Sequence, residues 1–214
     1  MEIFKLIKNR DLEGINDLLK TDAATLKLQD ENGLSPLMLS LYYQDQAITE
    51  KILEYLEEFN IYEAAALGYK EQISAFLNNY PEQVNEFSSD GFTLLGLAAF
   101  FGKIDVVKIL INAGVDVNLR SHNAMNVAPL HSAVARGSFE ILEQLLVAGA
   151  VPDIEQNNGI TALHAAALHG NMEMAKLLIS YGADPFHASS DGKSSLDYAR
   201  EGEHEDMIRF LESF

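Results

Sequence analysis

The sequence contains no cysteine, and this excludes disulfide bonds, thiolate nucleophiles and thiolate metal ligands. Basic residues are scarce: 15 Lys and Arg stand against 32 Asp and Glu, so the formal net charge is −17. A surface this acidic repels phosphate backbones and anionic lipids, so we expect neither nucleic acid nor a membrane as partner. The charge favours a basic partner, or serves only to keep an extended surface soluble.

Long apolar runs are missing too. Residues 1–10 carry apolar side chains at helical spacing rather than in one run, which fits neither a signal peptide nor a membrane span. With the absence of cysteine, this favours a cytoplasmic location. No low-complexity tract or linker divides the 214 residues, and an apolar content of 48% is enough for one continuous core.

Catalytic and metal-binding motifs are also missing. The chain has no G-x-S-x-G elbow, Walker loop or dinucleotide fingerprint. No two of its six histidines have the i, i+4 spacing of a helical zinc site, and Asp30-Glu31-Asn32-Gly33 lacks the alternating ligands of a calcium loop. We therefore expect no metal, no cofactor and no catalytic residue. An enzyme would need a site without a visible motif, such as a hydrolase site built from scattered carboxylates and His169.

What the sequence does contain is a repeated segment. Residues 159–185 hold a turn glycine, a short helical pattern, a glycine break, a second helical pattern and a Gly-Ala-Asp turn. The first apolar residue of each short helical pattern serves as a marker. These markers are Leu95, Leu130, Leu163 and Leu196, at intervals of 35, 33 and 33 residues. One such segment cannot bury its own apolar face, so copies must stack on each other.

A shift of 58 residues superposes the first half of the chain on itself without a gap, placing Ile3 on Ile61 and Leu37 on Leu95. The first member of each superposed block lacks the entry turn. Residues 46–66 fit a helix that passes almost directly into the next inner helix near Asn60. We divide the chain into seven units of one domain, 1–29, 30–59, 60–87, 88–120, 121–154, 155–187 and 188–214.

Thr161-Ala162-Leu163-His164 and the two alanines that follow resemble the T-P-L-H-x-A-A signature of the ankyrin repeat, and Gly182-Ala183-Asp184 resembles its exit turn. The interval near 33 is similar to that family's period. The resemblance implies an all-α solenoid of about seven stacked helix pairs joined by β-hairpin-like turns. It also implies that His131 and His164 bond within and between turns as part of the scaffold. The segment 61–68 is most similar to bacterial members.

Turn and cap residues recur with the units. The turns are expected to need positive φ at Gly33, Gly91, Gly159 and Gly192, with Asn126 in the place of glycine in one unit. The hydroxyl residues expected to cap the inner helices are Ser35, Thr93, Thr161 and Ser194.

The resemblance places partner contacts on the concave face, at turn tips and on inner helices. The candidate partner-binding residues are Leu34, Tyr42, Tyr43, Leu67, Phe92, Phe100, Phe101, Met125, Val127, Arg136, Ile160, Leu168 and His169. Such a set is too apolar for an idle surface, and aromatic residues and arginine are enriched in interface hot spots. The alternative is that Tyr43 and Phe101 turn toward a neighbouring helix and belong to the core, whereas Tyr42 and Phe92 are expected to stay exposed.

The sequence therefore predicts a non-catalytic scaffold that binds a partner protein in its concave groove, as a monomer more readily than as a homodimer. Two alternatives remain. One is a dedicated accessory or regulatory subunit of a metabolic or stress-response enzyme. The other is a homo-oligomer closed through the apolar groove.

Overall fold

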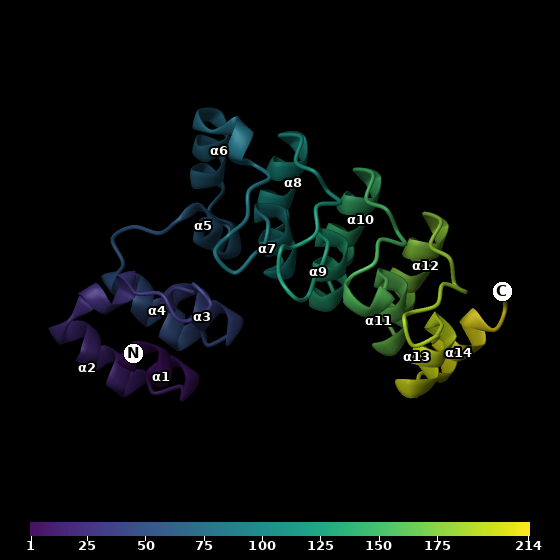
Figure 1. Cartoon of the computed structure of the whole chain (residues 1–214), viewed down its shortest axis with the longest axis horizontal. Coiled ribbons are helices and arrows are strands. Elements are labelled where there is room, and N and C mark those ends of the chain that lie inside the picture. The colour runs from purple at the N-terminus through teal and green to yellow at the C-terminus, as the bar shows by residue number, and fades with distance from the viewer.

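The computed structural model describes all 214 residues and consists of seven consecutive helix pairs (Figure 1). The pairs are α1 (Glu2–Lys8) with α2 (Leu12–Thr21), α3 (Pro36–Tyr42) with α4 (Gln46–Tyr55), α5 (Ile61–Leu67) with α6 (Lys70–Asn79), α7 (Leu94–Phe100) with α8 (Ile104–Asn112), α9 (Pro129–Arg136) with α10 (Phe139–Val147), α11 (Ala162–Leu168) with α12 (Met172–Ser180), and α13 (Ser195–Glu201) with α14 (Glu205–Leu211). Short 3₁₀ turns lie at Ala23–Lys27, Pro81–Gln83 and Asn157–Gly159. The predicted all-α solenoid is confirmed.

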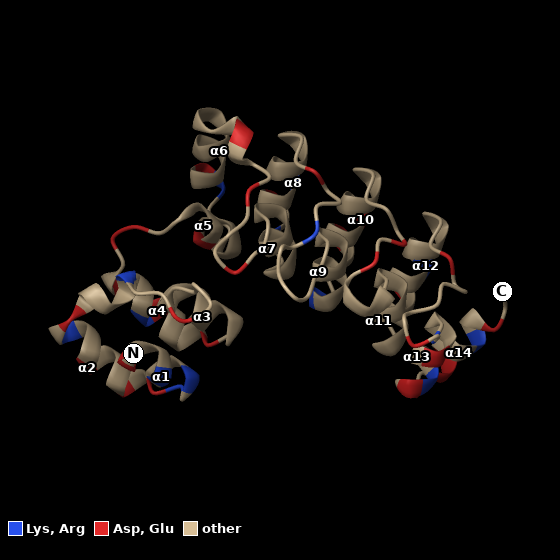
Figure 2. Cartoon of the chain, viewed as in Figure 1, with Lys and Arg blue, Asp and Glu red and all other residues tan.

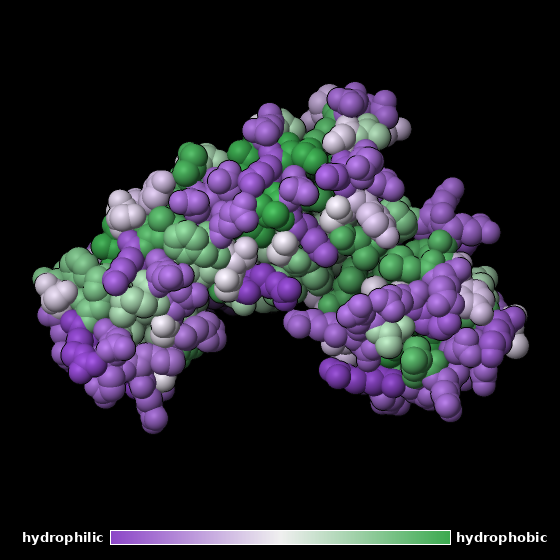
Figure 3. Space-filling model, turned by 180° about the vertical axis from the view of Figure 1, so that it is seen from behind, coloured by the Kyte–Doolittle hydropathy of each residue, from purple (hydrophilic) through white to green (hydrophobic).

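The molecule is an arch. The inner helices α5, α7, α9, α11 and α13 contact one another in sequence, and the outer helices α6, α8, α10 and α12 follow on the convex side (Figure 1). Seen from behind, the two ends of the arch lie on either side of a hollow (Figure 3). The inner helices face that hollow, so the structure has the concave surface that the sequence predicts.

Stacking between pairs supplies the core. In α8, the side chains of Val106, Val107 and Leu110 are completely buried because they recur at helical spacing on the face turned toward the neighbouring pairs. The marker residues Leu130 and Leu163 are also completely buried. Removing a leucine or valine side chain from water stabilises a fold by about 1.5 to 3 kcal/mol, so each pair depends on its neighbours for stability.

Five turns close as hairpin-like tips through one backbone hydrogen bond each. The N–H groups of Asp30, Ser88, Ser121, Gln156 and Ser189 donate to the carbonyl groups of Leu34, Phe92, Val127, Ile160 and Lys193. Gly91 has φ +83°, and the N–H of His122 donates to its carbonyl at 2.7 Å. Asn126 has φ +51°, which confirms its predicted role in place of glycine.

The hydroxyl caps follow the prediction with one exception. Ser35 accepts a hydrogen bond from the N–H of Met38 at 3.1 Å, and Thr93 accepts one from the N–H of Gly96 at 3.0 Å. Ser194 caps α13 in the same way. Thr161 is the N-cap residue of α11 as predicted, but its hydroxyl lies 3.1 Å from Nδ1 of His164, which also accepts the Thr161 N–H at 3.0 Å.

The prediction for residues 46–66 is confirmed in part: an inner helix begins beside Asn60, but α4 does not continue into it. Helix α4 ends at Tyr55, and residues 56–60 form a connection without helical structure before α5 begins at Ile61. Asn60 starts the new helix because its side chain accepts hydrogen bonds from two N–H groups of the first turn, while the Glu63 carboxylate accepts the N–H of Asn60 at 2.8 Å. Helices α1 to α4 form a group at one end of the arch, and α3 contacts α5 (Figure 1).

The break divides the core in two. The N-terminal core contains ten buried residues of the first two units, and the main core contains 32 buried residues from units 3 to 7. A small cluster of Met38, Ala66 and Leu97 lies between them, and Phe59 packs against both cores. The two parts of the arch are thus joined by few apolar contacts.

Candidate partner-binding surface

The structure leaves none of the thirteen predicted residues fully buried. Four are exposed, namely Met125, Arg136, Leu168 and His169. The other nine are half-buried. The exposed residues all belong to units 5 and 6, whereas the predicted residues of units 2 to 4 are all half-buried. The accessible part of the surface is therefore displaced toward the C-terminal half of the arch.

Tyr42 lies in an aromatic cluster. Its ring centroid is 5.4 Å from that of Phe101, 5.9 Å from that of Phe100 and 6.5 Å from that of Phe92. Its hydroxyl donates to Oδ2 of Asp90 at 2.8 Å. Burial, with the negative charge of Asp90, raises the pKa of Tyr42, so the phenol stays protonated and remains a donor.

The expectation that Tyr42 and Phe92 stay exposed is wrong, because the third unit has no turn tip. The tips of units 2 and 4 meet directly, and the hydroxyl of Ser89 donates to the carbonyl of Gly33 at 2.6 Å. Unit 3 contributes Ala66 and the half-buried Tyr62 to the apolar cluster against which Tyr42 and Phe92 pack. Tyr42 therefore reaches past unit 3 and packs on unit 4.

The alternative interpretation of the aromatic pairs agrees with the structure. Tyr43 packs against the N-terminal core, as does Leu67 from the next unit. Phe101 packs against the small cluster between the two cores. These side chains contribute to cohesion between units, which limits what they can offer to a partner.

We call Phe100, Met125, Arg136, Leu168 and His169 the groove patch. The side chain of Met125 is 58% exposed and that of Leu168 is 36% exposed. Hydrogen bonds between units hold the backbone beneath both: the N–H of Asn157 donates to the carbonyl of Met125 at 3.2 Å, and Nε2 of His204 lies 3.0 Å from the carbonyl oxygen of Leu168. The patch therefore presents apolar side chains on a fixed frame.

His131 and His164 join adjacent units, as the resemblance implied. Nδ1 of His131 accepts the N–H of Ala128 at 3.1 Å, which leaves Nε2 to donate to the carbonyl of Ile160 in the next tip at 3.2 Å. Burial lowers the pKa of His131 to about 4. His164 makes the same pattern with the N–H of Thr161 and the carbonyl of His187, and burial lowers its pKa too.

Glu63 occupies the equivalent helical position in α5, and sequence analysis did not single it out. Its side chain is 4% exposed. The carboxylate accepts the N–H of Asn60 and a short hydrogen bond from the Ser35 hydroxyl, so it reaches back to the preceding unit, whereas the histidines reach forward. The spacing of Asn60 and Glu63, which is typical of a capping box, was the available signal.

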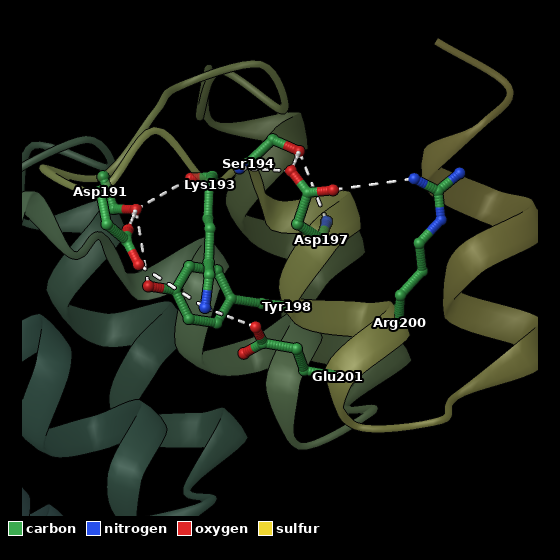
Figure 4. A network of polar contacts seen from close by, with 8 residues as sticks. Asp191, Lys193, Ser194, Asp197, Tyr198, Arg200 and Glu201 are labelled. Atoms are coloured by element: carbon green, nitrogen blue, oxygen red, sulfur yellow. Dashed lines mark hydrogen bonds and ion pairs between the residues drawn. The ribbon is translucent and has the colours of Figure 1, made fainter.

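A polar network ends the groove at the last unit (Figure 4). Lys193 on the tip pairs with Glu201 at the end of α13 and lies 3.6 Å from Asp191. Its Nζ is also 5.8 Å from the ring centroid of Tyr198. The charged side chains of the tip and of the inner helix in this unit are thus paired with each other.

No group of three or more His, Asp or Glu side chains is placed to hold a metal ion. Likewise, none of the helices has both the length and the apolar character needed to cross a membrane.

A family model for ankyrin repeats in three copies matches residues 3–121, 61–156 and 130–213. These matches overlap and together extend over nearly the whole chain. The chain belongs to the ankyrin-repeat family. Ankyrin repeats generally mediate contacts between proteins, and the five hairpin-like tips and the inner helices of this ankyrin-repeat chain form the surface described above.

Three relatives show how the similarity is distributed. The chain is 39% identical to human BCL-6 corepressor-like protein 1 over 99 residues, covering 46% of this chain and 5% of that protein. It is 26% identical to the probable 26S proteasome regulatory subunit p28 of Saccharomyces cerevisiae, covering 63% and 64%. It is 28% identical to the chicken nuclear factor NF-kappa-B p105 subunit, covering 68% and 13%. The chain thus spans less than two thirds of each relative.

Proposed function

We propose that this protein is a non-catalytic scaffold that binds a partner protein along the concave face of units 4 to 6. The observation that carries the proposal is the exposure of Met125 and Leu168 on backbone that neighbouring units hold in place. Arg136 ends α9, the inner helix of the unit that carries Met125 at its tip. Apolar side chains with an arginine are typical of interface centres.

The expected affinity for the partner protein is set by the burial of a few apolar side chains. Removing a methionine or leucine side chain from water contributes about 1.5 to 3 kcal/mol, and the contribution is smaller here because both are already partly covered. A rigid backbone reduces the ordering cost of association. Three or four such contacts support binding of roughly micromolar strength.

Charge supports a partner with a basic surface. Acidic residues lie on the turns and on the C-terminal helices, with fewer basic residues among them (Figure 2). With a net charge of −17, the chain attracts a basic protein from solution and accelerates encounter. Because exposed charges are screened, we expect the association rate to fall as ionic strength rises.

Capture from lysate of the source organism tests the proposal. The wild-type protein is compared with a Met125→Glu, Leu168→Glu double variant and with Val147→Glu. Val147 is the matched control because it is 66% exposed at the end of the outer helix α10. We expect a partner that wild type and Val147→Glu retain and the double variant loses. Equal retention by all three, with circular dichroism unchanged, would place the site elsewhere.

A second candidate is a regulatory subunit of a larger enzyme. The similarity to the probable proteasome regulatory subunit of yeast, which covers 63% of this chain, favours it. A captured partner that is an enzyme, bound at a fixed ratio and changed in turnover by the wild-type protein, would support this candidate. A stable dimer of the chain alone in light scattering, lost in the double variant, would favour the homo-oligomer over both.

A further inference from the structure

Two basic side chains, Arg136 of the groove patch and the neighbouring Lys103, form no ion pair. Their neighbours on the outer helices are paired, since Lys70 lies 3.7 Å from Asp105 and Lys108 lies 2.8 Å from Glu140. The chain carries 32 acidic and only 15 basic side chains, so two cations that line one recess form a local exception to its charge.

Both cations line a recess of about 310 Å³ between the turn that joins α3 to α4 and the end of α9. Leu41, Phe100 and Phe101 form the apolar part of its wall. A volume near 300 Å³ is at the lower end of ligand pockets and suits a side chain or a short peptide rather than a cofactor.

Two glycines make room for the cations. A methyl group added at Gly68 would lie 3.0 Å from Cδ of Lys103, and one added at Gly102 would lie 3.2 Å from Nε of Arg136. The aliphatic part of Lys103 therefore rests on the backbone at Gly68, and Arg136 crosses the backbone at Gly102. The two side chains are held beside the recess by these contacts rather than by a counter-charge.

The remaining acid of the wall does not neutralise them. The Glu50 carboxylate accepts a hydrogen bond from the amide of Gln46 at 2.8 Å on its own helix and forms no ion pair with Lys103. Burial, with the neighbouring charge of Arg136, lowers the pKa of Lys103. The recess thus carries two positive charges and the single negative charge of Glu50 next to aromatic rings, and an anion placed between Lys103 and Arg136 would relieve their repulsion.

We propose that this recess receives a carboxylate side chain of the partner protein, with an apolar neighbour of that residue packed on Phe100. Lys103 and Arg136 would both donate charge-assisted hydrogen bonds to the carboxylate. This inference rests on the proposed function, because Arg136 and Phe100 belong to the groove patch. It adds a specific anchor: a largely basic partner must present one acidic residue at this point.

The inference is tested by titrating the full chain with the blocked dipeptide of phenylalanine and aspartate while recording the backbone amide signals of Gly68 and Gly102 by NMR. The counterpart dipeptide with asparagine is the ligand control. We expect both signals to shift and saturate at millimolar aspartate dipeptide, with the asparagine dipeptide about ten-fold weaker. Arg136→Gln and Lys103→Gln should each abolish that preference, whereas Lys108→Gln should keep it.

Three results would overturn the inference. Equal binding of the two dipeptides would make the recess merely apolar, and no shift of either signal would leave it without a ligand. Inorganic phosphate that shifts the same signals at lower concentration than the aspartate dipeptide would assign the recess to phosphate. Arg136 is exposed, so its variant is expected to fold. If the aspartate dipeptide does not bind while capture of the partner still depends on Met125 and Leu168, only the carboxylate-binding proposal is wrong. The proposed scaffold function is then still supported.

Discussion

The hydroxyl of Tyr42 donates a hydrogen bond to Oδ2 of Asp90 at 2.8 Å, although the whole helix pair of α5 and α6 separates the two residues along the chain. The bond joins unit 2 to unit 4 directly. With the bond from Ser89 to Gly33, it fastens the first two units, which have a core of their own, to the rest of the arch.

Replacing Tyr42 with phenylalanine should loosen this connection. The change removes a partly buried hydrogen bond to a charged group, and such bonds contribute about 1.5 to 3 kcal/mol. We expect faster amide hydrogen exchange in α1 to α4, with exchange in α11 to α14 unchanged. Tyr43→Phe is the matched control, because the Tyr43 hydroxyl forms no hydrogen bond within the protein, and it should leave exchange as in wild type. Exchange rates in α1 to α4 of Tyr42→Phe that equal those of wild type would contradict the role of the bond.

Glu63→Ala should destabilise the same junction. It removes the acceptor for the Asn60 N–H and for the Ser35 hydroxyl, so the free energy of unfolding should fall by about 2 kcal/mol. Glu63→Gln keeps one acceptor oxygen and should cost less. Glu58→Ala, at an exposed position just before the helix, should change the free energy of unfolding by under about 0.5 kcal/mol. Urea denaturation measures all three, and equal effects at residues 58 and 63 would refute the capping argument.

Stability should depend on pH through His131. Its pKa is about 4 in the folded protein against an ordinary value of 6.5. Above pH 6.5 the His131 side chain is neutral in both the folded and the unfolded chain, so its contribution to the free energy of unfolding is fully present. Between pH 6.5 and pH 4 the unfolded chain binds a proton that the folded chain does not, and stability falls as pH falls. The loss between pH 7 and pH 5 is about 2 kcal/mol.

His131→Gln isolates this contribution from the carboxylates, which titrate in both proteins. The variant should be less stable at pH 7 because the bonds to Ala128 and Ile160 are altered. Its free energy of unfolding should nevertheless change less between pH 7 and pH 5 than that of wild type. Parallel pH profiles of the two proteins would show that His131 is not held neutral by burial.

Much of the fold follows from local pattern. Leu130 and Leu163 recur at the family's period and are completely buried, and Asn126 adopts positive φ where the other tips use glycine. These features depend on residues within one unit and its next neighbour. Periodicity describes such relationships directly.

The site was less predictable because two of its contacts skip a unit. Tyr42 was assigned to the surface on the assumption that each unit covers the next, and the missing tip of unit 3 instead brings it onto Phe101 and Asp90. That contact cannot be read from spacing alone. The break between α4 and α5 could have been predicted, because the spacing of Asn60 and Glu63 is typical of a capping box that begins a new helix.

Site-specific photo-crosslinking tests the central claim most directly. A benzophenone amino acid is introduced at residue 168 on the concave face or at residue 147 on the convex face, and the protein is irradiated in cells of its source organism. The account predicts a covalent adduct with one partner protein from residue 168 and none from residue 147. An adduct from residue 147 alone, or equal adducts from both, would contradict a binding site in the groove.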